Sequence, residues 1–121
     1  MQNVGKIALG FFVLLFAASA FAAKARRIEI ETKLFDGTVH WSPEKIEVKR
    51  GERIEIVANH KLVGGFDFHG LYIPELDVAD QVDRNVEKKV TKTVPKNLAP
   101  GEYKLGCQFH PGHVPATLVV K

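Results

Sequence analysis

Strict alternation of apolar and charged residues is the feature that most limits how this chain folds. Apolar residues take every second position in segments 28–31, 45–49 and 53–58, and every other position except Val57 carries Glu, Lys or Arg. A period of two places one set of side chains on each face of a strand, whereas a helix would scatter both sets around its surface. The pattern predicts strands with one buried and one solvated face.

Further strands are predicted along the rest of the chain. Segment 103–107 alternates after the turn residues Ala99-Pro100-Gly101, and segment 118–120 supplies a last strand. The apolar and aromatic segment 66–73 is predicted to be a strand close to the core, and the β-branched segment 86–94 an edge strand. The acidic segment Pro74–Asp83 is expected to be a loop or one helical turn. Seven or eight short strands at this spacing predict an all-β, antiparallel two-sheet sandwich.

The N-terminal segment has the pattern of an export signal. Lys6 is the one charge before an apolar run at 7–16, and segment 18–22 ends with small residues at the A-x-A positions of a cleavage site. We therefore predict a secretory signal peptide at residues 1–22 and a single domain at 23–121. The apolar run is short for a spanning helix, so we expect a periplasmic protein without stable membrane insertion after signal cleavage.

Charge and motifs exclude several classes of function. The chain has 17 Lys and Arg against 14 Asp and Glu, with both signs interspersed. This balance does not predict a nucleic-acid partner. The sequence has no Gly-rich phosphate-binding loop, no G-x-S-x-G motif and no paired carboxylates placed for hydrolysis, so it does not predict a hydrolase.

The strongest chemical signal is Cys107-Gln108-Phe109-His110-Pro111-Gly112-His113, which contains the only cysteine of the chain. Pro-Gly inside the segment excludes a helix and predicts a tight loop between two strands. A thiolate and two imidazoles are ligands that suit copper or zinc. The alternatives are a buried cysteine with two unrelated surface histidines, or a cysteine nucleophile with a histidine base. The short spacing favours joint binding of a metal.

Segment 101–113, with the pattern G-x-Y-x-x-x-C-x-x-H, resembles the C-terminal copper loop of cupredoxins, and its spacing is that of amicyanin-type short loops. Segment 69–76 is similar to the first-histidine segment of cytochrome oxidase subunit II-like and nitrosocyanin-like cupredoxins. The resemblance implies the Greek-key β-sandwich of the cupredoxin fold. It also implies one copper ion, with His69, Cys107 and His110 among its ligands.

His113 stands where the resemblance would place a weak axial methionine. The only methionine of the chain is Met1, so an axial methionine is excluded. An imidazole is a stronger and harder donor than a thioether, which favours Cu(II) and lowers the reduction potential. We therefore expect a green or red copper protein in place of an intensely blue one.

Two further residues, His60 and Trp41, could belong to the metal site. His60, in a polar turn, is the alternative to His69, which lies in an apolar strand. Trp41 is expected in the core or at the end of the sandwich, with no role toward a cofactor.

Asn often follows the first histidine in blue copper proteins and ties the ligand loops together. Gly70 takes that position here, so this role does not transfer. An apolar rim of Phe109, Pro111 and Gly112 is expected around His110.

The resemblance implies a protein that shuttles single electrons between periplasmic protein redox partners. Two alternatives remain open at the level of the sequence. One is copper-dependent oxidation of ferrous iron linked to iron uptake, with iron-uptake components as partners and a ferroxidase-like activity. The other is copper binding for homeostasis. A zinc site with the same ligands is the alternative to copper.

Overall fold

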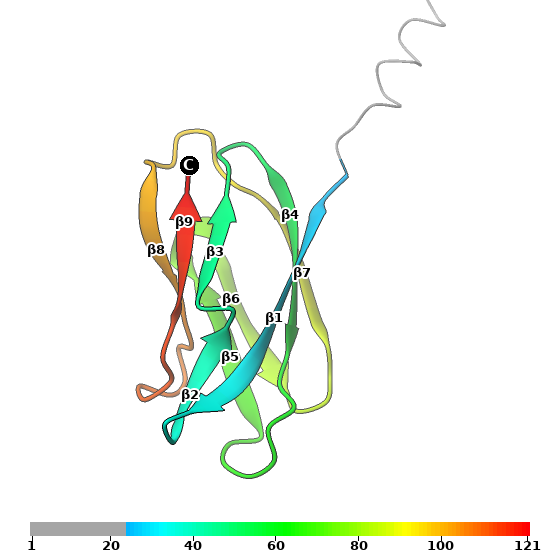
Figure 1. Cartoon of the computed structure of the whole chain (residues 1–121). Helices are drawn as coiled ribbons and strands as arrows, with labels where there is room; N and C mark the ends of the chain where they lie inside the picture. Colours follow the sequence, from blue (N-terminus) through cyan, green and yellow to red (C-terminus); the bar gives the residue numbers. More distant parts are fainter. Residues whose placement is uncertain (1–23) are drawn as a thin grey trace, which may run out of the picture.

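A computed structural model describes residues 24–121 of the chain. They form nine strands and one 3-10 turn (Figure 1). The predicted signal peptide at residues 1–22 lies outside the described residues and stays a prediction. The elements are β1 (Arg26–Phe35), β2 (Thr38–Ser42), β3 (Lys45–Val48), β4 (Arg53–Asn59), β5 (Phe68–Ile73), η1 (Pro74–Leu76), β6 (Val78–Asp83), β7 (Lys88–Thr93), β8 (Gly101–Leu105) and β9 (Ala116–Val120).

The strands form two layers. One sheet has the order β2-β1-β4-β7, and the other has the order β3-β9-β8. The hairpin of β5 and β6 continues the second layer, because Tyr72 and Gly106 exchange two backbone hydrogen bonds of 3.0 and 2.9 Å. This bridge lies three residues after His69 and directly before Cys107. It therefore brings two segments of the predicted metal site side by side.

The alternating segments bury the faces that the sequence predicted. Ile28 and Ile30 of β1 lie beside Ile56 and Ala58 of β4 in the pairing register, and all four side chains are buried. Full burial of one such aliphatic side chain stabilises the fold by about 1.5–3 kcal/mol. The predicted all-β, two-sheet sandwich is confirmed. The segment predicted as an edge strand is β7, which lies at the edge of its sheet.

The direction of two strand pairs differs from the antiparallel expectation. β1 pairs with β4 in parallel, and β3 pairs with β9 in parallel, while the other four pairs are antiparallel. The chain crosses from one sheet to the other before and after β3, so β1 and β4 become neighbours without a hairpin between them. Alternation of side chains reports the faces of a strand but not its direction.

The expectation of a loop or helical turn over Pro74–Asp83 was wrong for most of the segment. Only Pro74–Leu76 forms a turn, and Asp77 ends it in the left-handed conformation with φ 56°. The following residues form β6, in which Val78 and Val82 are buried. Asp80 takes the position between these valines on the same face of the strand, so the alternation was not recognised in the sequence.

The loops at one end of the sandwich carry the predicted site. Figure 1 shows the β1–β2 turn, the β4–β5 loop and the β8–β9 loop together at the end opposite the C-terminus. In residues 24–121, no helix is long and apolar enough to cross a membrane.

Candidate metal centre

His69 enters the site from β5, in the second layer of the sandwich. Its neighbours Gly70, Leu71 and Ile73 are buried in the core, and His69 itself is only 2% exposed. The strand is therefore anchored by core packing directly after the ligand position. This anchoring gives the imidazole a defined place at the end of the sandwich.

Cys107 and His110 come from the loop after β8. The backbone N–H of His113 donates to the carbonyl of His110 at 3.0 Å, so Pro111 and Gly112 take the two central positions of a tight turn. The N–H of Val114 donates to the carbonyl of Val39 at 2.8 Å, which ties the loop to β2. The predicted tight loop is thus held at both ends.

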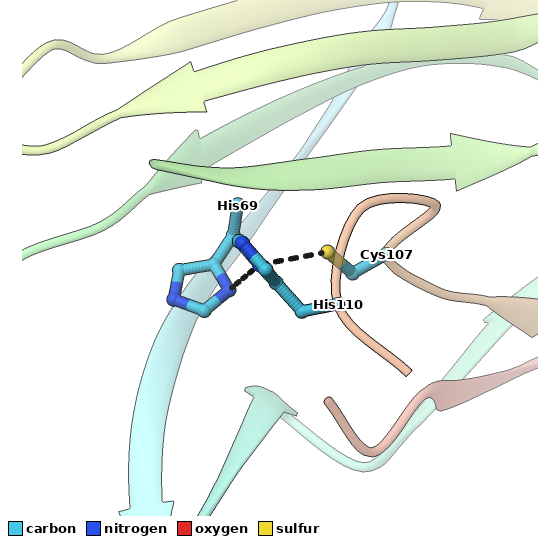
Figure 2. Close-up of side chains that lie close together, drawn as sticks. All are labelled: His69, Cys107 and His110. Carbon is cyan, nitrogen blue, oxygen red and sulfur yellow. Dashed lines mark hydrogen bonds between the residues drawn. The ribbon is translucent and has the colours of Figure 1, made fainter. Parts of the chain in front are cut away.

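Three donor atoms converge between these segments, and Figure 2 shows the side chains facing one another. The donor atoms of His69, Cys107 and His110 all lie within 4.8 Å of one another. Nδ1 of His110 lies 3.3 Å from Nδ1 of His69 and 3.7 Å from Sγ of Cys107. Two imidazoles and one thiolate in such a cluster are the donor set of a trigonal copper site.

His113 adds a third imidazole, and so a fourth candidate donor, next to this cluster. Its Nδ1 lies 2.9 Å from Nδ1 of His69, and its side chain is buried. It is not part of the set whose donor atoms all lie within 4.8 Å of one another. His113 thus lies beside His69, while its distance from at least one of the other two donor atoms exceeds 4.8 Å. Its role as an axial donor stays a prediction.

The chemistry of this cluster fits a bound cation. Nδ1 of His69 faces two other ring nitrogens, and a neutral imidazole has only one N–H to share. Burial, with smaller effects from neighbouring histidines, lowers the pKa of His69 to about 4 and that of His113 to about 3. Near neutral pH both rings are uncharged, and uncharged rings are what a metal requires of its imidazole ligands.

These two pKa values predict that the metal-free protein loses stability in acid. The ordinary histidine pKa is 6.5, so the unfolded chain takes up protons before the folded chain does. Stability is then complete above pH 6.5 and falls as the pH drops toward 4 and 3. Thermal unfolding of metal-free protein between pH 7 and 5 should show a falling midpoint. The decrease should be smaller in His113→Gln, which lacks one of the two buried imidazoles. An equal decrease in both proteins would contradict a lowered pKa of His113 in the folded state.

Gly70 connects the two ligand segments through its backbone. Its N–H donates to Sγ of Cys107 at 3.0 Å, a hydrogen bond that stabilises a thiolate. A Cβ atom at this position would lie 1.9 Å from Oε1 of Gln108 and 3.0 Å from its backbone nitrogen. A side chain such as Asn would therefore require the Gln108 side chain to move away and the loop backbone to shift slightly, because this loop packs directly on Gly70.

Trp41 links the two ligand segments, a role for which the sequence had indicated no residue once Gly70 took the place of Asn. Its indole Nε1–H lies 3.0 Å from the carbonyl of Gly70 and 3.2 Å from that of Gly106, and it donates to both. These two residues directly follow His69 and precede Cys107. The ring is fully buried and lies 5.3 Å from the ring of His113. The expectation of a core residue is met, but Trp41 also links the two ligand segments.

Trp41→Phe is expected to destabilise the protein by about 1–3 kcal/mol, because it removes the only donor on the indole and leaves an aromatic ring in the core. Chemical denaturation of wild type and variant measures this difference. Hydrogen exchange at the amides of Gly70 and Gly106 should become faster in the variant. An unchanged midpoint together with unchanged exchange would show that the indole bonds do not hold the ligand segments together.

His60, the alternative to His69, lies outside the cluster and makes other contacts. Its Nε2 lies 2.9 Å from the carbonyl of Phe66, and its Nδ1 lies 2.8 Å from Oγ1 of Thr32. Both ring nitrogens are thus engaged, and the ring packs edge-on against His69 at 4.5 Å. The geometry favours His69 over His60 as a donor.

The expected rim around His110 is wider than the sequence indicated. A cavity of about 630 Å³ opens at this end, and Phe109, Pro111 and Gly112 lie along it. Phe66 from the β4–β5 loop and Val39 from β2 complete the apolar part of its wall. Phe66 was predicted only as part of a strand. Nothing in the local sequence shows that its ring contacts the ring of His110, more than forty positions later.

The chain is similar to known proteins in both sequence pattern and fold. A family model described as a cupredoxin-like domain matches residues 6–120. No curated protein matches the sequence. Auracyanin A, a "blue" copper protein from the green thermophilic photosynthetic bacterium Chloroflexus aurantiacus, is similar with a TM-score of 0.60 and 17% identity, covering 81% of this chain and 100% of that one.

The similarity in fold extends to a domain of a cytochrome oxidase subunit. The periplasmic domain of subunit II of cytochrome oxidase from Bradyrhizobium japonicum has a TM-score of 0.56 and 11% identity, covering 82% of this chain and 86% of that one. At these identities the structural similarity shows a common fold.

Proposed function

Because the chain belongs to the family of cupredoxin-like domains, we propose that it binds one copper ion through His69, Cys107 and His110. His113 is the fourth, axial donor in this proposal. The function proposed for the loaded protein is transfer of single electrons between protein redox partners in the periplasm.

The observation that carries the proposal is the convergence of two imidazoles and one thiol within 4.8 Å at the loop end of the sandwich. The donors come from β5 and from the loop before β9, which are joined by the bridge between Tyr72 and Gly106. A soft thiolate with imidazoles selects copper over harder cations. The imidazole of His113, with Nδ1 2.9 Å from Nδ1 of His69 but outside the set of three, is available as a fourth ligand.

The residues of this chain are suited to hold a metal with little movement. Trp41 and Gly70 supply hydrogen bonds to the ligand segments, and the turn at Pro111-Gly112 fixes the distance from His110 to His113. Hydrogen bonds around the ligands of this kind orient them and tune the metal. When bound, copper supplies a one-electron couple between Cu(II) and Cu(I). A rigid ligand set reduces the rearrangement that accompanies a change of charge.

A periplasmic location and protein redox partners are part of the same proposal. They are supported by the predicted export signal at residues 1–22 and by the fold shared with a periplasmic domain of cytochrome oxidase subunit II. The apolar wall beside His110 offers a surface of the kind that transient protein contacts use.

Metal analysis with optical and EPR spectra of the purified protein tests the proposal. We expect one copper per chain and visible absorption that a reductant bleaches and an oxidant restores. His110→Asn should lose this copper, whereas His40→Asn, a histidine of β2 outside the donor cluster, should keep it. A colourless protein with stoichiometric zinc, or equal behaviour of the two variants, would overturn the copper assignment.

A further inference from the structure

The ring of Phe66 lies flat on the ring of His110. The ring centroids are 3.7 Å apart and the planes differ by 14°, whereas the other aromatic pairs around His69 and His110 are tilted or edge-on. The side chain of Phe66 is 57% exposed. One of its faces therefore covers the imidazole, and much of the remaining ring is open to solvent.

The loop that carries this ring has little apolar packing of its own. Residues 61–67 lie between β4 and β5, and Val63 in their middle is 98% exposed. Gly64 and Gly65 have φ values of 82° and 70°, which turn the chain sharply. A glycine-containing loop without core contacts would sample many conformations unless other groups hold it.

Arg84 holds this loop from the end of β6. Its guanidinium donates to the carbonyls of Leu62 at 2.8 Å, Gly64 at 3.0 Å and Phe66 at 2.9 Å. It also donates to the carboxylate of Asp67 at 2.7 Å, and its backbone N–H donates to the carbonyl of Asp67 at 2.8 Å. A planar fork of donors makes such a set of bonds, which a lysine ammonium does not reproduce.

His60 holds the same loop from the inside. Its side chain is 1% exposed, and its Nε2 donates to the carbonyl of Phe66 at 2.9 Å, since a carbonyl oxygen only accepts. In the neutral ring, Nδ1 then accepts from the hydroxyl of Thr32 at 2.8 Å. The carbonyl of Phe66 thus receives two hydrogen bonds, one from His60 and one from Arg84. These bonds place the residue whose ring covers His110.

We propose that Phe66 is a lid on the ligand ring of His110, with Arg84 and His60 as the residues that position it. The lid keeps His110 in its ligating orientation and keeps water from one face of the ring, so it slows loss of the metal. This inference rests on the proposed function, in which His110 is a metal ligand. Arg84 acts only through Phe66, whereas His60 also packs edge-on against the ring of His69 at 4.5 Å.

Removal of bound copper by an excess of chelator, followed by stopped-flow absorbance, tests the lid. An aromatic pair of this kind predicts that Phe66→Leu loses copper roughly three- to tenfold faster than wild type. Phe66→Tyr should stay near the wild-type rate because it keeps the ring. Arg84→Lys keeps the charge but not the fork, so it should also lose copper faster. Val63→Ala, in the same loop, is the matched control and should match wild type.

A second measurement uses the metal-free protein. Stacking on Phe66 should shift the ring-proton NMR signals of His110 upfield, and this shift should disappear in Phe66→Leu and decrease in Arg84→Lys. Equal rates of copper loss in wild type and Phe66→Leu would overturn the lid. So would an unchanged His110 shift in both variants. A wild type whose His110 signals do not respond to added copper would contradict the proposed function, while the ring-current shift would still report whether the rings stack.

Discussion

Cys107→Ser is expected to abolish stable copper binding and all visible absorption of the Cu(II) form. Cys107 is the only cysteine of the chain, so the variant has no thiolate to take its place. Loss of a partner that only supports a ligand typically lowers metal affinity by about 10–100-fold, and loss of the soft ligand itself should exceed that. Copper content after gel filtration and an optical titration with Cu(II) measure the effect.

The fold of Cys107→Ser should be retained. Serine is close to cysteine in size, and its hydroxyl can accept the hydrogen bond that Gly70 donates to Sγ. Circular dichroism and thermal unfolding of the metal-free variant provide the control. If the folded variant retained stoichiometric copper with the wild-type spectrum, Cys107 would not be a ligand and the proposed site would be wrong.

His113→Met should turn the protein blue and raise its reduction potential. A thioether is a softer and weaker donor than an imidazole, so the variant should favour Cu(I) and bring the site closer to trigonal geometry. A tenfold change in the relative affinity for the two oxidation states corresponds to about 59 mV for one electron, and we expect at least this increase. Spectroelectrochemical titration of both proteins gives the two potentials and the two spectra.

His113→Gln is the matched control for this substitution, because it keeps a hard donor at the same position. Its potential should stay closer to that of wild type than the potential of His113→Met does. A wild-type protein with one dominant blue band would show that the imidazole of His113 is not a strong ligand. In that case the methionine variant would differ little from wild type.

Much of the fold could be predicted from the sequence, because a strand with one buried face has an apolar residue at every second position. Ile28 and Ile30, or Ile54 and Ile56, face the core because one side of each strand must leave water. This periodicity was not recognisable in β6, because Asp80 stands between the two buried valines on the inner face of the strand. The alternation of side chains also does not show whether neighbouring strands run parallel or antiparallel. The parallel pairing of β1 with β4 was therefore seen only in the structure.

The donor residues could be named from the sequence for a different reason. Cys107, His110 and His113 lie within one loop, and Pro111-Gly112 limits the shapes that this loop takes. His69 required the resemblance to cupredoxins, since His60 is equally suitable by residue type. The structure separates the two histidines by their hydrogen bonds, because both nitrogens of His60 are engaged elsewhere.

By itself, the sequence determined which faces of the strands are buried and which short loop holds the thiol and two imidazoles. Both follow from contacts between residues a few positions apart, where spacing alone restricts geometry. Only the tertiary structure decided what surrounds the site. Trp41 bonds to carbonyls 29 and 65 positions away, and Arg84 reaches back 17 positions to the loop that carries Phe66. Such contacts depend on how the sheets stack and leave no period in the sequence, which is why Trp41, Phe66 and Arg84 had no predicted role toward the metal.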